Sequence, residues 1–184
     1  MTGSGGPILV VGGVRSGKSR WAEELARRAQ EDTGWPVTYL ATAEALDDEM
    51  RERIHRHRMR RPSDWRTVEE PLEVADWFSR SPGAAVVVLE CLTLLLNNWM
   101  MAGLADDRSF DMRRRALVDA LAGYAGRVIV VSNEVGLGVM PANAMARRYA
   151  DWLGLLNQAV AARASRVYAV LAGLPIDLRG LGAP

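Results

Sequence analysis

The run GGVRSGKS at residues 12–19 constrains the fold of this chain more than any other feature. It follows the apolar run ILVV, precedes an amphipathic pattern, and matches the spacing G-x-x-x-x-G-K-S from Gly12 to Ser19. A backbone with few Cβ atoms lets successive N–H groups and a helix N-terminus surround a phosphate. We therefore predict a phosphate-binding loop between a strand and a helix. A glycine turn that merely joins the two elements is the alternative.

Lys18 is the only lysine in the chain, which contains 22 arginines. In a phosphate-binding loop, a lysine at this position reaches the β- and γ-phosphates as a compact charge. A guanidinium is a broad planar fork, which does not suit that role. The pattern therefore predicts a catalytic lysine at Lys18, and it predicts that the hydroxyl of Ser19 holds Mg²⁺.

Short β-rich runs alternate with helical patterns along the chain. We predict strands at Ile8–Val11, Val37–Leu40, Val86–Leu89, Val128–Val131 and Val167–Leu171, and helices at Lys18–Gln30, Leu46–Arg60, Leu92–Met101, Met112–Tyr124 and Asn143–Ala164. The stretch from 102 to 110 is predicted to be a loop. This alternation predicts an α/β fold with a mainly parallel sheet and helices on both faces, where ligands collect at the carboxyl ends of the strands.

Length and composition predict one domain over residues 1–184. The formal net charge of +1 gives no case for a nucleic-acid or anionic-membrane partner. The longest apolar stretch, residues 84–96, is too short for a membrane span, and the N-terminal MTGSGGP lacks the basic region of a secretory signal. A single cysteine, Cys91, permits no internal disulfide. We interpret it as a core residue of a protein in the reducing cytoplasm.

Two apolar runs end in acidic side chains. VVVLE ends at Glu90, and VIVVSNE ends with Asn133 and Glu134. Both ends fall where a phosphate-binding fold presents its ligands, and an acid at Glu90 could hold Mg²⁺. A helix N-cap or first-turn acid is the other interpretation of Glu90. The residues alone leave both roles open.

Both histidines of the chain, His55 and His57, lie in the arginine-rich segment LDDEMRERIHRHRMRR. At about 100° per residue, Leu46, Met50 and Ile54 form an apolar stripe whose centre falls near His57, whereas His55 points away. We therefore predict that His57 faces the protein body, as a reactive group or as a satisfied core histidine. The arginines of this segment are typical of a solvent-exposed helix face, and they are weak support for a nucleic-acid-binding surface.

Several segments together resemble one enzyme family, the adenosylcobinamide kinase/adenosylcobinamide-phosphate guanylyltransferases of cobalamin biosynthesis. The similar segments are GGVRSGKSRWAEELA, YLATAEALDDEMRERIHRHRMRRPSDWRTVEEP, LECLTLLLNN, VSNEVGLGVMP and RRYADWLGLLNQAVA. The resemblance extends from about Ile8 to Leu174, and DDEM, WRT and NEVG in this order carry its specificity. It implies a P-loop NTPase fold of the RecA type and a homotrimer. It also implies two reactions: phosphorylation of the aminopropanol hydroxyl with ATP or GTP, then GMP transfer from GTP through a guanylylated histidine.

The resemblance also implies site residues. The nucleophile falls on His57. The metal ligands predicted from the loop motif and the strand end are Ser19 and Glu90. The implied nucleotide contacts are Gly12, Gly13, Val14, Arg15, Ser16, Gly17, Lys18, Ser19, Thr42, Ala43, Glu44, Arg58, Met59, Arg60, Arg61, Glu69 and Glu90. The chain differs from the family pattern of paired histidines at Arg56. It also differs from the following Lys-Asp-Gly-Arg-like run, where Arg60 replaces glycine.

Two other functions fit the residues alone. A kinase of another small molecule would use the histidine segment only as a lid. A RecA-like ATPase would be stimulated by nucleic acid, although the near-zero net charge argues against it. The N-K-x-D motif that reads guanine in GTPases is absent, so guanine preference depends on the resemblance. We therefore expect a corrinoid, GTP or ATP and Mg²⁺ as partners, with no nucleic acid and no stable membrane insertion.

Overall fold

The computed structural model describes residues 5–44, 48, 51–52, 58–59, 61–81, 83–104, 106–138 and 141–181. These residues form one seven-stranded sheet in the order β3-β2-β4-β5-β1-β6-β7. The strands are β1 (Ile8–Gly12), β2 (Val37–Ala41), β3 (Arg66–Glu69), β4 (Val86–Glu90), β5 (Arg127–Asn133), β6 (Arg166–Leu171) and β7 (Leu174–Asp177). Neighbouring strands are parallel except for β6 and β7, which form an antiparallel pair at one edge.

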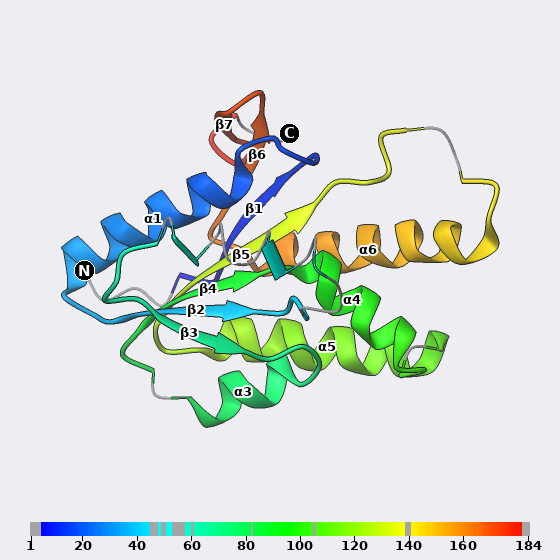
Figure 1. Ribbon diagram of the computed structural model, residues 1–184, viewed down its shortest axis with the longest axis horizontal. Coiled ribbons are helices and arrows are strands. Elements are labelled where there is room, and N and C mark those ends of the chain that lie inside the picture. Colours follow the sequence, from blue (N-terminus) through cyan, green and yellow to red (C-terminus); the bar gives the residue numbers. More distant parts are fainter. Residues whose placement is uncertain are drawn as a thin grey trace.

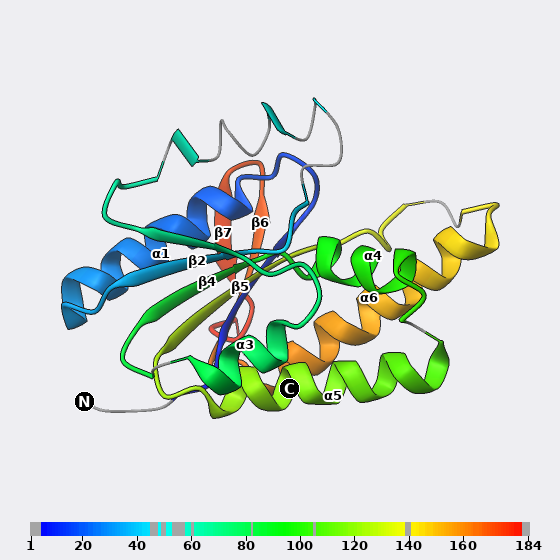
Figure 2. The same cartoon turned by 60° about the horizontal axis from the view of Figure 1, so that its bottom comes forward.

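Helices cover both faces of the sheet (Figures 1 and 2). The described helices are α1 (Lys18–Thr33), α3 (Val74–Arg80), α4 (Leu92–Met101), α5 (Asp107–Gly123) and α6 (Ala144–Arg163). Figure 2 shows α1 on one side of the sheet and α3, α5 and α6 on the other. The buried side chains form two clusters that correspond to these faces, one with the alanines of α1 and one with the apolar residues of α3 to α6. None of the described helices is long and apolar enough to cross a membrane.

The two-residue period of β4 explains why this strand is apolar nearly to its end. Val86 and Val88 belong to the cluster under α1, whereas Val87 and Leu89 belong to the cluster under α3 to α6. A strand buried on both faces needs a continuous apolar run. Glu90 continues the phase of Val86 and Val88, and its side chain therefore lies on the α1 side of the sheet.

The five predicted strands are all present, with bounds that differ by a residue or two. The helix predicted at 92–101 has those bounds, and the helices at 18–30 and 143–164 were predicted to within a few residues. Three short elements were missed: β3, α3 and β7. β3 is a four-residue edge strand without a long apolar run, and β7 carries a proline, which edge strands tolerate. The predicted helix 46–60 falls largely outside the described residues.

The loop prediction for 102–110 is wrong over its last four residues, because α5 begins at Asp107 and not at Met112. The side chain of Asp106 accepts a hydrogen bond from the backbone N–H of Ser109, and the hydroxyl of Ser109 accepts one from the backbone N–H of Asp106. This reciprocal capping box satisfies two N–H groups at the helix start. It makes the polar run DDRS, from Asp106 to Ser109, a helix N-terminus.

Candidate active site

The loop between β1 and α1 has the shape that its glycines predict. Gly17 has a φ of 96°, in the left-handed region that favours glycine. A Cβ atom on Gly12 would lie 2.5 Å from Oγ of Ser16 and 2.6 Å from the backbone oxygen of Val170 in β6. The glycines at both ends of the motif are therefore required, one by backbone conformation and the other by the closeness of a neighbouring strand.

The N-terminus of α1 suits an anion. No side chain caps this helix, and its first turn contains no acidic residue, so the field of its N–H groups is not offset there. Nζ of Lys18 donates a hydrogen bond to the backbone oxygen of Gly13 at 3.2 Å, which folds the ammonium group back over the loop. A charged ammonium and a helix N-terminus thus lie at the same loop, as phosphate binding requires.

Ser19 and Glu90 meet at the carboxyl end of the sheet. The hydroxyl of Ser19 donates a hydrogen bond to Oε1 of Glu90 at 2.5 Å. The hydroxyl of Tyr39, from β2, donates to Oε2 of the same carboxylate at 2.8 Å. Both carboxylate oxygens therefore have a hydroxyl donor. The interpretation of Glu90 as a helix cap does not describe this geometry, because α4 has Cys91 at its N-cap position and no side-chain cap.

The oxygens of Ser19 and Glu90 fit Mg²⁺, which prefers oxygen ligands and commonly uses one or two protein groups together with substrate phosphates. Among the described residues, no group of three or more His, Cys, Asp or Glu side chains could hold a metal by itself. A Mg²⁺ ion held by Ser19 and Glu90 would complete its coordination with water and substrate phosphates.

A cavity of about 190 Å³ opens beside Glu90. Six of its lining residues were predicted as site residues: Val14, Ala43, Arg58, Arg61, Glu69 and Glu90. The others were not predicted as nucleotide contacts: Tyr39, Ala41, Thr67, Cys91, Thr93, Leu94 and Asn133. Most of the missed residues stand at or just beyond the carboxyl ends of β2, β4 and β5. That position was the available signal for them.

Two arginines line the cavity. Nη2 of Arg58 forms an ion pair with Oε1 of Glu69 at 2.7 Å. Cζ of Arg61 lies 3.2 Å from the ring centroid of Tyr39, and its Nη1 donates to Oγ1 of Thr67 at 3.2 Å. The cavity therefore combines the carboxylate of Glu90, which bonds the loop, and the Arg58–Glu69 pair with a second guanidinium group, and guanidinium groups could bind phosphate oxygens.

Burial changes the acidity of two groups in this cavity. It raises the pKa of the Tyr39 hydroxyl well above its usual value, and the negative charge of Glu90 adds to this effect. The hydroxyl therefore stays protonated and remains a donor to Glu90. Burial also raises the pKa of the Cys91 thiol, with a further contribution from Glu90. The thiol stays neutral and is a poor nucleophile, in agreement with the prediction that Cys91 is a core residue.

Other predicted residues lie away from this cavity or outside the described parts of the chain. Thr42 is fully buried, and its hydroxyl donates to the backbone oxygen of Cys91 and accepts from the backbone N–H of Cys91, each at 2.8 Å. Glu44 and Met59 are exposed and do not line the cavity. His57 and Arg60 lie outside the described residues, so their assignments stay predictions.

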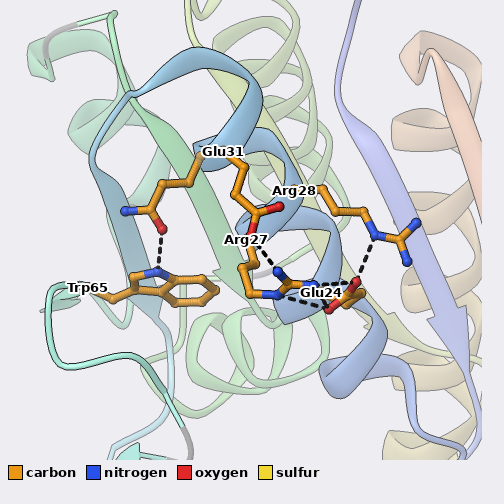
Figure 3. A network of polar contacts seen from close by, with 6 residues as sticks. Glu24, Arg27, Arg28, Glu31 and Trp65 are labelled. Carbon is orange, nitrogen blue, oxygen red and sulfur yellow. Dashed lines mark hydrogen bonds and ion pairs between the residues drawn. The ribbon is translucent and has the colours of Figure 1, made fainter.

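A larger cavity of about 550 Å³ lies along the outward face of α1 and contains Gly17 from the loop. Figure 3 shows that three of its charged groups pair with one another or with Glu31. Arg27 pairs with Glu24 and Glu31, and Arg28 pairs with Glu24. The smaller cavity is lined by Glu90, which bonds Ser19 of the phosphate-binding loop, so it is the better candidate for the reacting phosphates.

Comparisons with known proteins found one matching family and similar curated proteins. Residues 8–178 match the family described as cobinamide kinase / cobinamide phosphate guanyltransferase. The bifunctional adenosylcobalamin biosynthesis protein CobP of Pseudomonas aeruginosa is 47% identical over 173 residues, which cover 94% of this chain and 96% of that protein. The corresponding protein CobU of Salmonella typhimurium is 37% identical over 185 residues, which cover 94% of this chain and 99% of the relative.

A solved structure agrees in fold only. The flagellar accessory protein FlaH of Methanocaldococcus jannaschii matches with a TM-score of 0.51 and 13% identity, over 90% of this chain and 70% of that chain. Together with the strand order and the glycine-rich loop after β1, the match confirms the predicted fold class, a RecA-like P-loop NTPase fold.

Proposed function

Because the chain belongs to the cobinamide kinase / cobinamide phosphate guanyltransferase family, we propose that it catalyses two successive transfers to adenosylcobinamide. The first transfers the γ-phosphoryl group of ATP or GTP to the aminopropanol hydroxyl. The second transfers GMP from GTP to the resulting phosphate and gives adenosylcobinamide-GDP. Family membership selects this function over a kinase of another small molecule and over a nucleic-acid-stimulated ATPase.

One observation carries the proposal. Glu90 bonds Ser19 of the phosphate-binding loop and lines one cavity with Arg58 and Arg61. A single nucleotide could therefore have some phosphate oxygens at the loop and others near guanidinium groups. The arginines follow His57 closely in the chain, which supports a role for them in the histidine-dependent step.

In the kinase step, the substrate hydroxyl attacks the γ-phosphorus, the bond to the β–γ bridging oxygen breaks, and the nucleoside diphosphate leaves. We assign Lys18 to the β- and γ-phosphate oxygens, where its compact charge offsets the negative charge of the transition state. We assign Ser19 and Glu90 to hold Mg²⁺, which would supply further neutralisation of the phosphates. The other nucleotide contacts predicted from Gly12 to Glu90 remain part of this proposal.

In the transferase step, neutral imidazole of His57 attacks the α-phosphorus of GTP, and pyrophosphate leaves. The product is a phosphoramidate. A phosphate oxygen of adenosylcobinamide phosphate then attacks the same phosphorus, and protonation makes the imidazole a good leaving group. Arg58 and Arg61 would offset the charge on pyrophosphate and on the bound GMP.

Three further features belong to the proposal. One sheet includes strands from Ile8 to Asp177, which supports a single nucleotide-binding domain over residues 1–184. A homotrimer is expected from the family resemblance. The one cysteine, buried and free, is compatible with a cytoplasmic location.

Covalent labelling tests the proposal. The protein is incubated with Mg²⁺ and GTP labelled on the α-phosphate, and the denatured protein is then counted. We expect bound label that is lost in acid and kept in alkali, as a phosphoramidate requires. Addition of adenosylcobinamide phosphate should discharge the label into adenosylcobinamide-GDP. If the parent protein binds no label, the transferase function is contradicted, and the protein would then act only as a kinase.

Two histidine variants identify the nucleophile. His57→Ala should accept no label and lose guanylyltransferase activity, while kinase activity with ATP persists. His55→Ala is the matched control and should still accept label, because the helical phase of the sequence predicts that this side chain points off the apolar stripe. Label that survives in His57→Ala and disappears in His55→Ala would assign the nucleophile to His55 instead.

A further inference from the structure

Tyr39 contacts both ends of the candidate site, although the sequence did not mark it as a site residue. Its side chain is 1% exposed. Its hydroxyl donates to Oε2 of Glu90 at 2.8 Å, and its ring centroid lies 3.2 Å from Cζ of Arg61. One side chain thus touches the acid that bonds the phosphate-binding loop and an arginine that lines the cavity.

We propose that Tyr39 is a positioning residue, which orients the carboxylate of Glu90 toward Ser19 and holds the guanidinium of Arg61 at the cavity. The terminal torsion of a glutamate has a broad energy profile, so a carboxylate with one free oxygen would rotate easily. The bond from Tyr39 holds Oε2 and leaves Oε1 directed at Ser19. This inference rests on the proposed function, because it concerns the residues assigned there to Mg²⁺ and phosphate.

The position of the Arg61 guanidinium depends on the ring of Tyr39 and not on its hydroxyl. Nε of Arg61 is buried and has no hydrogen-bond partner among the described residues. A guanidinium that loses water without gaining a full set of acceptors is costly to bury. The face of an aromatic ring at 3.2 Å compensates part of this cost by a cation–π contact. The bond from Nη1 to Thr67 fixes the group from the other side.

The position of Tyr39 in β2 explains how it reaches both groups. Val37 and Tyr39 belong to the buried cluster under α1, and Ala41 packs against the same cluster. In the parallel pair of β2 and β4, Tyr39 is opposite Val88 and Ala41 is opposite Glu90. Glu90 is therefore the next residue of β4 on the face that Tyr39 occupies. The residue opposite Glu90 is a small alanine, so the carboxylate can reach the hydroxyl.

Tyr39→Phe separates the hydroxyl from the ring. Binding of a fluorescent N-methylanthraniloyl-GTP is measured as free Mg²⁺ is increased. We expect the half-saturating Mg²⁺ concentration to increase about tenfold, because Glu90 loses one charge-assisted hydrogen bond. Nucleotide affinity measured in EDTA should stay at the parental value, since the ring still supports Arg61.

Tyr39→Leu removes the ring as well. We expect the same increase in the Mg²⁺ requirement, together with weaker nucleotide binding in EDTA, because Arg61 loses its aromatic contact. The difference in nucleotide affinity in EDTA between the Phe and Leu variants thus measures the contribution of the contact between Arg61 and the ring of Tyr39. Equal affinity of the two variants in EDTA would overturn the part of the proposal that concerns Arg61.

Tyr149→Phe is the matched control. The hydroxyl of Tyr149 donates to the backbone oxygen of Thr93 at 3.1 Å, and the side chain packs against the cluster under α3 to α6, whereas Tyr39 belongs to the cluster under α1. Removal of the Tyr149 hydroxyl should lower the melting temperature and leave the Mg²⁺ requirement unchanged. If Tyr39→Phe behaves in the same way, Tyr39 is only structural and the proposal fails. Parent protein that forms the acid-labile label would still support the proposed function in that case, so the two failures are distinguishable.

Discussion

Ser19 and Glu90 are 71 positions apart in the chain, and the hydroxyl of Ser19 donates a hydrogen bond to Oε1 of Glu90 at 2.5 Å. One residue belongs to the first turn of α1 and the other ends β4, which is separated in the sheet by β5 from the loop strand β1. The contact joins the phosphate-binding loop to the acid at the end of an apolar strand. It is the structural reason to treat both as ligands of one cation.

We expect kinase activity to require lysine at position 18, so that no other basic residue can replace it. Lys18→Ala should abolish phosphorylation of adenosylcobinamide while the protein stays folded. Lys18→Arg should also lose most of the rate, because the planar guanidinium does not fit a loop closed over the backbone oxygen of Gly13. Steady-state kinase assays measure this, with Arg27→Lys on the exposed face of α1 as control. Parental turnover in the Lys18→Arg variant would refute the geometric account of this single lysine.

Glu90→Gln should lower nucleotide turnover by about tenfold or more, with little change in melting temperature. The amide replaces one acceptor oxygen by a donor, so it cannot accept hydrogen bonds from both Ser19 and Tyr39. It also loses the charge that Mg²⁺ would neutralise. Turnover and thermal unfolding are measured together, and Glu31→Gln in α1 should change neither. Intact activity with a sharply lower melting temperature would show that Glu90 is structural.

Gly12→Ala should destabilise the fold by about 1–3 kcal/mol and weaken nucleotide binding, as overpacking does. The added Cβ would lie 2.6 Å from the backbone oxygen of Val170, which cannot move without shifting β6. Urea unfolding and nucleotide titration measure the two effects. Gly123→Ala is the control, because a Cβ there meets no atom within 4 Å. If Gly12→Ala proves as stable as Gly123→Ala, the close approach of β6 is not limiting.

Asp106 should stabilise α5 in a pH-dependent way. Hydrogen bonds from Ser109, backbone first, lower the pKa of the Asp106 carboxyl below its usual 3.8. A lowered folded-state pKa adds stability above the unfolded pKa, and this stability is lost as pH falls through the folded value. The melting temperature of the parent should therefore exceed that of Asp106→Ala near neutral pH, and the difference should shrink below about pH 4.

The control for this prediction is Asp106→Asn, which keeps a capping acceptor but does not titrate. The difference in melting temperature between Asp106→Asn and Asp106→Ala should change little with pH. Thermal unfolding followed by circular dichroism between neutral and acidic pH gives all three curves. A gap between parent and Asp106→Ala that stays constant down to the lowest pH would show that the ionised carboxylate is not what stabilises the helix.

Much of the fold could be predicted from local patterns. Apolar runs such as residues 86–89 predicted strands buried on both faces, and the glycines around Lys18 predicted the phosphate-binding loop. These signals are local, because side-chain period and backbone freedom depend on residues close in the chain. The short edge strands β3 and β7 escaped prediction, because an exposed edge demands no continuous apolar run.

Local sequence by itself determined the loop chemistry, the alternation of strands and helices, and the presence of an acid at the end of β4. Only the tertiary structure decided that Glu90 accepts hydrogen bonds from Ser19 and Tyr39. It also decided that the guanidinium of Arg61 lies over the ring of that tyrosine, and that the hydroxyl of Thr42 is hydrogen-bonded to the backbone of Cys91. The physical reason is that a two-residue period assigns a side chain to a face. It does not specify which strands are neighbours or in what register, and those depend on packing between segments far apart in the chain.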